Sequence, residues 1–305
     1  MARKKLTFED IRMMKLSKRL DKIYAEAERG LTEKVNSFFA KFQELDEKKA
    51  LLVKEGKLGK REYYKWRKNK ILMGSTYTDL RDTIADKLSA TNAIATQYMN
   101  GELPKVYAHN FNDVGSNVER KVKGYSFDLV DETTIRKLST SKKTLLPYKK
   151  HDGKKDVRWN TKRVNAQILQ GILQGESAEQ MKQRLMKVTT MNKESALRNA
   201  RTAVTSAQNK GRLDAMKQVE EDGIVMGKEW IAAKDERVRE WHSDLDRVIL
   251  PVDKPFIAHI VSGKHAYDDE IMFPGDPNAD PANTYNCRCS IAEVILGFKK
   301  KGGEE

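Results

Sequence analysis

Hydrophobic residues in the first hundred positions recur at helical spacing, and charged residues occupy the opposite face of each run. Gly30 and Gly56 interrupt these runs, and a third run pauses at Gly74-Ser75 before it resumes. Such narrow apolar stripes are typical of helices that pack along a seam. The pattern predicts an N-terminal helical hairpin or bundle over residues 1–100, with the aromatic side chains in its core.

Residues 101–159 have a different texture, with frequent Gly, Pro, Asn and Asp. These residue types favour turns and end helices. We expect a basic, irregular linker region here, with short helices at about 113–122 and 131–139. Asp131 is placed to cap the second of these helices.

Helical spacing returns after the linker. Asn160 is expected to cap one helix, and Asn192 is expected to begin a longer one whose apolar stripe contains small residues. Ser177 and Gln180 have the spacing of a capping box, in which each side chain bonds to the other's backbone N–H. The small residues would allow another element to approach closely.

Two short apolar runs bounded by turns, 224–233 and 290–296, are the best strand candidates and could pair. The predicted fold class is mainly α with a small α+β C-terminal domain, in which long central helices carry a short-stranded, loop-rich head. The predicted regions are 1–100 (N-terminal helices), 101–159 (linker), 160–297 (one domain with helices over 160–222 and an α+β head over 224–297) and 298–305 (tail).

The chain of 305 residues has room for about two domains, and its mean hydropathy is low at -0.71. We expect no transmembrane helix, because no run of about eighteen apolar residues occurs. The basic N-terminus is not followed by an apolar segment, so a secretory signal is not expected either. The two cysteines lie two positions apart, which makes a disulfide unfavourable and predicts reduced thiols in a cytoplasmic setting.

The net charge of +14 is unevenly distributed, since residues 226–305 hold 11 Lys and Arg against 15 Asp and Glu. Residues 136–163 hold eleven basic residues against two acidic ones. Three interpretations stay open: a non-specific nucleic-acid contact, an acidic protein surface, or a solvated linker without a partner. The candidate nucleic-acid-binding residues are Lys142, Lys143, Lys149, Lys150, Lys154, Lys155, Arg158, Lys162 and Arg163.

Both cysteines and three of the five histidines fall in the last eighty residues. His242, Cys287 and Cys289 are candidate zinc ligands, with a further His or Asp as the fourth. The second tight ligand pair of many zinc sites is absent, so a buried thiol pair in a turn is the alternative. The spacing does not fit a zinc deaminase, and no local signature supports a cysteine nucleophile.

Asp235, Arg237, Arg239 and His242 follow closely after a candidate strand that contains Trp230. Polar groups at this spacing can fix long loops through buried hydrogen bonds and ion pairs. Arg288 lies between the cysteines, and its guanidinium suits a bidentate pair with a carboxylate. We therefore expect these side chains to form a structural network.

Together these motifs resemble those of the minor head, or head-morphogenesis, proteins of tailed phages, the Mu F-like family, over about residues 160–297. The residues of the resemblance are Arg201-Thr202, Lys228-x-Trp230, Asp235-x-Arg237-x-Arg239-x-x-His242, Pro274-Gly275-Asp276-Pro277 and Asn286-Cys287-Arg288-Cys289. The sequence departs from the family pattern at Arg247, where a glycine is common, and at Ala203, where an acid is common.

The resemblance implies a non-enzymatic virion component, present in few copies in the capsid interior or at the portal vertex, and made in the host cytoplasm. Its implied partners are the portal protein, packaged double-stranded DNA and capsid or scaffold proteins, with no membrane and no cofactor apart from the zinc considered above. Two alternatives stay open: a zinc-dependent enzyme or toxin-like effector delivered with phage DNA, and a scaffold or adaptor without a nucleic-acid role.

Overall fold

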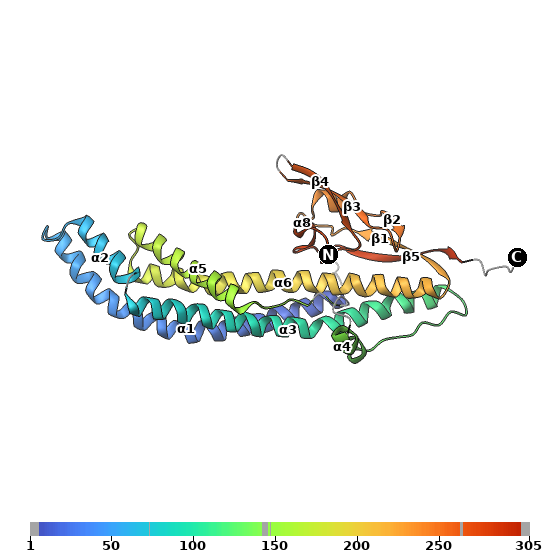
Figure 1. Cartoon of the computed structure of the whole chain (residues 1–305), viewed down its shortest axis with the longest axis horizontal. Coiled ribbons are helices and arrows are strands. Elements are labelled where there is room, and N and C mark those ends of the chain that lie inside the picture. The colour runs from blue at the N-terminus through green and yellow to red at the C-terminus, as the bar shows by residue number, and fades with distance from the viewer. Residues whose placement is uncertain (1–5, 73, 142–145, 147, 263–264, 300–305) are drawn as a thin grey trace, which may run out of the picture. The chain divides into compact units, whose positions relative to one another are not determined.

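The computed structural model describes residues 6–72, 74–141, 146, 148–262 and 265–299. It is mainly helical, with short antiparallel strands towards the C-terminus, which confirms the expected fold class (Figure 1). The helices are α1 (Phe8–Lys54), α2 (Lys60–Leu72), α3 (Ser75–Lys121), α4 (Glu132–Ser141), α5 (Gly153–Leu173), α6 (Ala178–Glu221), α7 (Glu240–Ser243) and α8 (Pro281–Thr284). The strands are β1 (Ile224–Ile231), β2 (Ile249–Pro251), β3 (Phe256–Ser262), β4 (His265–Ile271) and β5 (Ser290–Phe298).

The chain divides into two compact units, each formed by segments that are distant in the sequence. The bundle unit consists of residues 17–97 and 150–197, and the head unit consists of residues 1–16, 98–149 and 198–305. Helices α1, α3 and α6 each contribute residues to both units.

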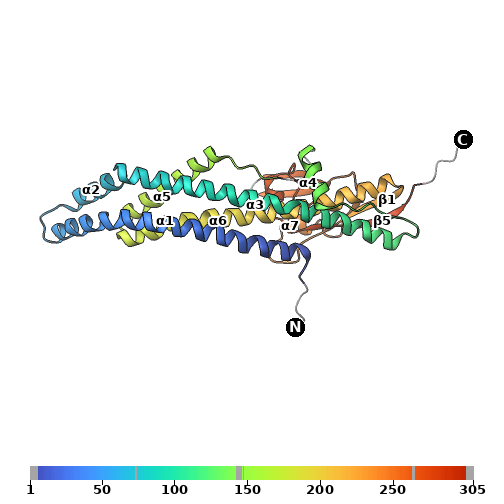
Figure 2. The same cartoon turned by 90° about the horizontal axis from the view of Figure 1, so that it is seen from below.

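The bundle unit is held together by an apolar core. Segments of α1, α3, α5 and α6 lie side by side in both views (Figures 1 and 2). Their apolar stripes meet in one cluster of buried side chains, as the helical spacing predicted. The cluster includes Leu31, Val35, Phe39, Phe42, Tyr77, Leu80, Ile84, Leu88, Val164, Ile168, Ile172, Met181, Leu185 and Val188.

The prediction that Gly30 ends the first helix is wrong, because α1 is continuous through that position. Buried Ala27 and Leu31 on either side keep the apolar stripe in register. A glycine in a helix costs about 1 kcal/mol relative to alanine, which the burial of the flanking side chains outweighs. The predicted pause at Gly74-Ser75 is confirmed, since α2 ends at Leu72 and α3 begins at Ser75.

Asn160 and Asn192 do not begin helices but lie inside them, and both are buried. The amide of Asn192 donates to Asn160 Oδ1 at 2.8 Å, and the amide of Asn92 donates to Asn192 Oδ1 at 2.6 Å. Tyr24 donates in turn to Asn92 Oδ1 at 2.5 Å. These residues form a polar layer across α1, α3, α5 and α6. The sequence suggested caps because Asn favours helix ends, whereas tertiary partners make it favourable in the interior.

Two predicted helix starts are confirmed by their hydrogen bonds. Ser177 N donates to Gln180 Oε1 at 2.8 Å, and Gln180 N donates to Ser177 Oγ at 3.3 Å, which completes the capping box before α6. Asp131 Oδ1 accepts the backbone N–H of Thr134 at 2.7 Å and caps α4. The start of α5 is different from the prediction, because its N-cap is Asp152 rather than Asn160.

The expected irregular texture of residues 101–112 is wrong, because α3 continues through this segment with Pro104 inside the helix. The helix expected at about 113–122 is present as the end of α3, which runs to Lys121. Buried Leu103, Val106 and Val114 line this part of the helix, and their packing outweighs the helix-breaking residues. A Cβ at Gly115 would lie 1.9 Å from the Phe127 ring. The glycine there is a packing requirement and not a turn signal.

The head unit contains a three-stranded antiparallel sheet of order β2-β1-β5 and a separate β3-β4 hairpin. The predicted pairing of the first and last strands is confirmed, with Trp230 opposite Ile291 and Lys228 opposite Glu293. Strands β2, β3 and β4 lie between the two predicted strands, in the part of the chain expected to be rich in loops. In Figure 1 the strands lie along the C-terminal half of α6. Close approach within this unit also occurs at Gly211, where a Cβ would lie 2.6 Å from Tyr107 O.

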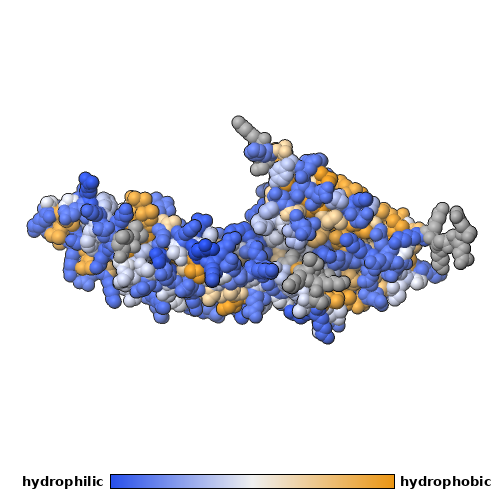
Figure 3. Space-filling model, in the orientation of Figure 1, coloured by the Kyte–Doolittle hydropathy of each residue, from blue (hydrophilic) through white to orange (hydrophobic). Residues whose placement is uncertain are grey.

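Hydrophilic side chains cover most of the helical surface in Figure 3, whereas apolar ones gather over the strands around β1 and β2. The exposed apolar side chains of the β2-β1-β5 sheet include Ile249, Leu296 and Phe298. Among the described residues, no helix combines the length and apolar character that crossing a bilayer requires.

Candidate functional site

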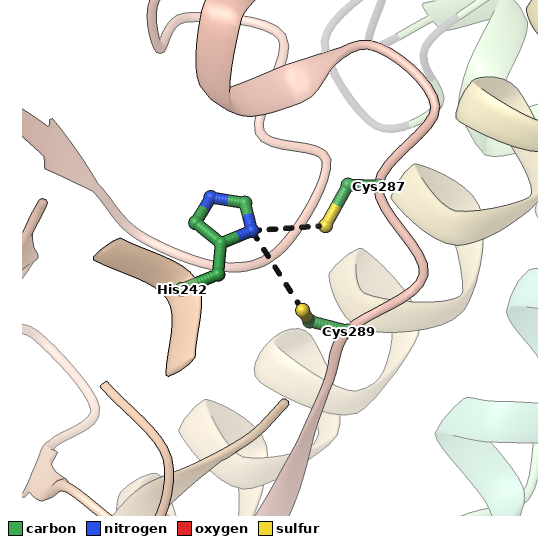
Figure 4. Close-up of side chains that lie close together, drawn as sticks. All are labelled: His242, Cys287 and Cys289. Atoms are coloured by element: carbon green, nitrogen blue, oxygen red, sulfur yellow. Dashed lines mark hydrogen bonds between the residues drawn. The ribbon is translucent and has the colours of Figure 1, made fainter. Parts of the chain in front are cut away.

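The head unit brings His242, Cys287 and Cys289 together from two distant parts of the chain (Figure 4). His242 lies on the one-turn helix α7, and the two cysteines lie immediately before β5. Since β5 pairs along the whole length of β1, the start of β5 is held beside the segment that leads from β1 to α7. The pairing of the predicted strands therefore positions the cluster.

Both sulfur atoms of the cluster face the same histidine nitrogen. Cys287 Sγ and Cys289 Sγ each lie 3.7 Å from His242 Nδ1. All three side chains are buried, with exposed fractions of 2 % or less. The hydrogen bond between the two thiols raises the pKa of Cys287 and lowers the pKa of Cys289, and His242 lowers the latter further. Both thiols are free.

The other face of the imidazole contacts Asn283 of α8. His242 Nε2 lies 3.2 Å from Asn283 Oδ1, and Trp241 Nε1 donates to the same oxygen at 2.7 Å. The amide nitrogen of Asn283 donates to Asp269 Oδ2 of β4 at 2.6 Å. The histidine is thus held by a relay of hydrogen bonds that begins at a carboxylate.

The cluster has three protein donors among the described residues, not the four that a closed zinc site requires. The expected fourth ligand, a further histidine or an aspartate, is not found there. His259 and His265 lie on the exposed β3-β4 hairpin, where His259 Nδ1 pairs with Asp268 at 2.5 Å. The sequence spacing of His259 and His265 did not predict that they lie on the hairpin, outside the buried cluster.

The predicted pair between Arg288 and a carboxylate is present. The guanidinium of Arg288 contacts both carboxylate oxygens of Asp235, with a distance of 2.8 Å from Nη2 to Oδ1. The backbone N–H of Arg237 donates to Asp235 Oδ1 at 2.9 Å. This bond and the nearby Arg288 lower the pKa of Asp235. Arg239 donates to the backbone oxygen of Tyr285 at 2.6 Å, so two arginines join this loop to the cysteine segment.

Helix α6 holds the cysteine segment through a row of polar side chains. Arg201 donates to Asn286 Oδ1, and Thr205 Oγ1 donates to the backbone oxygen of Cys287 at 2.9 Å. The amide of Asn209 donates to the backbone oxygens of Pro274 and Cys289 at 3.0 and 3.2 Å, and its Oδ1 accepts the N–H of Ile291 at 2.9 Å. The backbone at Asn286 adopts a positive φ of 59°, which asparagine tolerates better than most residues.

Sequence reasoning singled out Arg201 and Asn286 but missed Thr205, Asn209 and Asn283. A signal for two of them was available, because Thr205 and Asn209 follow Arg201 at intervals of four residues on one face of a helix. Nothing in the sequence marked Asn283, whose role depends on the fold of the preceding loop. The Pro274-Gly275 turn also meets α6, since a Cβ at Gly275 would lie 3.0 Å from Ser206 N.

Two further residues of the motif are buried beside the cluster. Trp230 is fully buried and meets His242 edge-on, with 5.2 Å between ring centroids. Lys228 is also fully buried, and its Nζ donates to Met272 O at 2.8 Å. Burial, followed by the positive charge of Lys217, lowers the pKa of Lys228 to about 8.

The basic candidates are divided between the two units. Lys142 and Lys143 lie outside the described residues. Lys149 belongs to the head unit, where its ammonium lies 6.0 Å from the Tyr285 ring, and Lys150 belongs to the bundle unit. The other five are exposed on α5 in the bundle unit, namely Lys154, Lys155, Arg158, Lys162 and Arg163.

These features define a class of protein: a helical bundle joined to a head whose strands and loops are fixed by buried polar contacts around a histidine and two cysteines. Residues 162–292 match the family described as Phage Mu protein F like protein. The chain is 26% identical over 281 residues to the minor head protein GP7 of Bacillus phage SPP1, covering 92% of this chain and 82% of that protein.

Two other relatives match shorter segments. The NAD(+)--arginine ADP-ribosyltransferase EFV of Enterococcus faecalis is 30% identical over 135 residues, which are 44% of this chain and 26% of the enzyme. The uncharacterized protein YqbB of Bacillus subtilis is 27% identical over 156 residues, covering 49% of this chain and 48% of that protein. No solved structure matches the chain.

Proposed function

We propose that this chain is a minor capsid protein of a tailed phage that acts in head morphogenesis, associates with the portal vertex and contacts packaged DNA without sequence specificity. The observation that carries the proposal is the similarity to a minor head protein along most of the chain, including helices outside the Mu F-like segment. The chain would be a virion component, inside the capsid or at the portal, after synthesis in the host cytoplasm.

The DNA contact is supported by the exposed face of α5. Among the residues that the structure describes, none of its five exposed basic side chains makes an ion pair. Arg163 lies over the half-exposed Trp159 ring at 5.0 Å, so an aromatic surface accompanies the charges. Lysine and arginine neutralise phosphates and release counterions, which gives binding to any duplex.

The positions of two of these lysines indicate that they do not serve to stabilise helix α5. Lys154 and Lys155 lie in the first turn of α5, directly after the N-cap Asp152. Cations are unfavourable there, because the N-terminal end of a helix carries partial positive charge. The two lysines therefore do not stabilise the helix, whereas the same helix end would attract the phosphates of a bound polyanion.

A charge-neutralised variant tests the DNA contact. Replacing Lys154, Arg158, Lys162 and Arg163 with glutamine is expected to weaken binding to any duplex. The slope of log K against the logarithm of the salt concentration should fall in magnitude by about 3 to 4, because each phosphate contact contributes about 0.9. The matched control replaces four exposed lysines of α2, with the same loss of charge, and should change binding little. Equal losses in both variants would show that net charge and not the α5 face binds DNA. The α2 lysines are Lys60, Lys65, Lys68 and Lys70.

The portal association has a separate test. The full chain, produced together with the portal protein encoded in the same phage genome, is expected to co-purify with portal oligomers. Electron microscopy of assembled heads should then locate the chain at the portal vertex. Heads that form normally and package DNA without this chain would contradict the role in morphogenesis.

The similarity to an ADP-ribosyltransferase favours a second candidate, a toxin-like effector delivered with the DNA. The match leaves most of that enzyme outside it, and the buried His242, Cys287 and Cys289 offer no surface to a substrate. We therefore propose that the chain has no enzymatic activity. Transfer of label from NAD+ to host proteins by the purified chain would establish the effector instead.

A further inference from the structure

We propose that His242, Cys287 and Cys289 bind a Zn²⁺ ion that ties the short helix α7 to the start of β5. The three donor atoms lie within 4.8 Å of one another, and each sulfur is 3.7 Å from His242 Nδ1 (Figure 4). In a tetrahedral zinc site, Zn–S bonds of about 2.3 Å and a Zn–N bond of about 2.0 Å separate N and S by about 3.5 Å. The donors therefore already have the spacing that the ion requires.

Hydrogen bonds to His242 do not by themselves account for the positions of both sulfurs. One imidazole nitrogen carries either one proton or one lone pair, so it can make a good hydrogen bond with only one of the two sulfurs. Both sulfurs nevertheless lie at the same distance from Nδ1. A cation between the three atoms satisfies all of them at once.

The contacts of Asn283 determine which histidine nitrogen is free. The indole N–H of Trp241 can only donate and the carboxylate of Asp269 accepts, so Asn283 must direct its oxygen at Trp241 and its nitrogen at Asp269. The same oxygen faces His242 Nε2, which must then carry the proton. Nδ1 is left with a lone pair directed at the sulfurs. Hydrogen bonds of this kind orient the histidine ligands of metal sites.

The charge and burial of the cluster select the ion. Two thiols and one neutral imidazole would bind Zn²⁺ with release of two protons, one from each thiol, which leaves a complex without net charge. A neutral complex suits a site in which all three side chains are buried. Zn²⁺ binds thiolate and imidazole ligands, whereas Mg²⁺ and Ca²⁺ prefer oxygen ligands. The three protein donors leave the fourth coordination position to a water molecule.

The ion would join segments separated by more than forty residues. Asp235 and Arg288, together with Arg239 and the backbone oxygen of Tyr285, already connect the loop before α7 to the cysteine segment from outside. Zinc would connect the same two segments from inside. The site is thus structural, and it goes beyond the proposed role in head assembly without depending on it.

The first test uses the unmodified chain. Protein purified without chelators is expected to contain one zinc per chain by elemental analysis. Exchange with Co²⁺ should give the visible d–d bands of a tetrahedral complex and a near-ultraviolet charge-transfer band from two thiolates. Removal of the metal should lower the melting temperature, and addition of Zn²⁺ should restore it. Metal-free protein that shows no Co²⁺ spectrum and no response to Zn²⁺ would overturn the proposal.

Variants of the ligands and of a residue that supports them locate the ion. Asn283→Leu leaves the three donor atoms in place but removes the hydrogen bonds to His242, Trp241 and Asp269. It should weaken Zn²⁺ binding by about 10- to 100-fold in competition with a chromophoric chelator. Cys289→Ser should abolish the thiolate band, and His259→Gln, which alters an exposed histidine of the same unit, should change neither. Full zinc content in the Cys287→Ser plus Cys289→Ser variant would place the ion elsewhere and overturn the proposal.

Discussion

The bundle unit and the head unit are stabilised in different ways. In the bundle unit, long amphipathic helices bury one apolar cluster, and a polar layer formed by Tyr24, Asn92, Asn160 and Asn192 borders it at one end. In the head unit, short strands and long loops are connected to α6 by individual hydrogen bonds, several from one side chain. The bundle unit is stabilised by apolar burial that many residues share, whereas the polar contacts of the head unit are made by a few side chains.

The largest effect is expected where one side chain makes several buried bonds. Asn209→Leu would leave the N–H of Ile291 and the carbonyl groups of Pro274 and Cys289 without their partner. Each unpaired buried group costs about 1–3 kcal/mol, so the head unit should lose about 5 kcal/mol of stability. Hydrogen exchange should show faster exchange in β1 and β5 and little change in α5. Equal acceleration in both units would contradict the independence of the two architectures.

The next largest effect is expected from shortening a core side chain in the bundle unit. Phe39 is 3 % exposed and packs edge-on against Phe38 and Phe42. Phe39→Ala should reduce the free energy of unfolding by about 4 kcal/mol through lost burial and the remaining cavity. Urea unfolding followed by the fluorescence of Trp66 and Trp159 measures this effect in the bundle unit. Leu51→Ala, at an exposed position of the same helix, is the control and should have an effect near zero.

The buried Lys228 gives the head unit a pH dependence that the apolar core lacks. Its pKa is about 8 in the folded protein, against 10.5 when exposed, so the burial penalty is complete below pH 8 and disappears towards pH 10.5. A shift of this size corresponds to about 3 kcal/mol. The stability of the wild type should therefore rise relative to Lys228→Met as the pH increases from 8 to 10.5. Denaturation curves of both proteins at several pH values measure this change, and a constant difference would contradict the buried charge.

The smallest effect comes from a pair of glycines in the same helix. Gly115→Ala introduces a Cβ into the Phe127 ring and should destabilise the head unit by about 2 kcal/mol through overpacking. Gly101→Ala meets no atom within 4 Å and should stabilise α3 by up to about 1 kcal/mol through helix propensity. Thermal unfolding of the two variants checks the opposite signs. A stability change of the same sign in both variants would show that helix propensity, and not packing against Phe127, determines the effect at Gly115.

Much of the local structure was predictable because it depends on nearby residues. The capping box of Ser177 and Gln180, the cap at Asp131 and the pause at Gly74-Ser75 follow from local backbone chemistry. The errors occurred at residues whose local preference and tertiary surroundings disagree. Gly30 and Pro104 break helices in isolation, and Asn160 and Asn192 cap them, yet all four lie inside helices that packing or buried partners stabilise.

The sequence by itself determined the fold class, the pairing of its two apolar strand segments and the family resemblance of its C-terminal motifs, because periodicity and motif spacing are properties of the chain. It also named His242, Cys287 and Cys289 as one candidate set. Only the tertiary structure decided that both sulfurs meet the same histidine nitrogen, that Asn283 orients the ring, and that no other histidine joins them among the described residues. Distances between side chains more than forty residues apart depend on how strands and loops pack, and no local pattern encodes them.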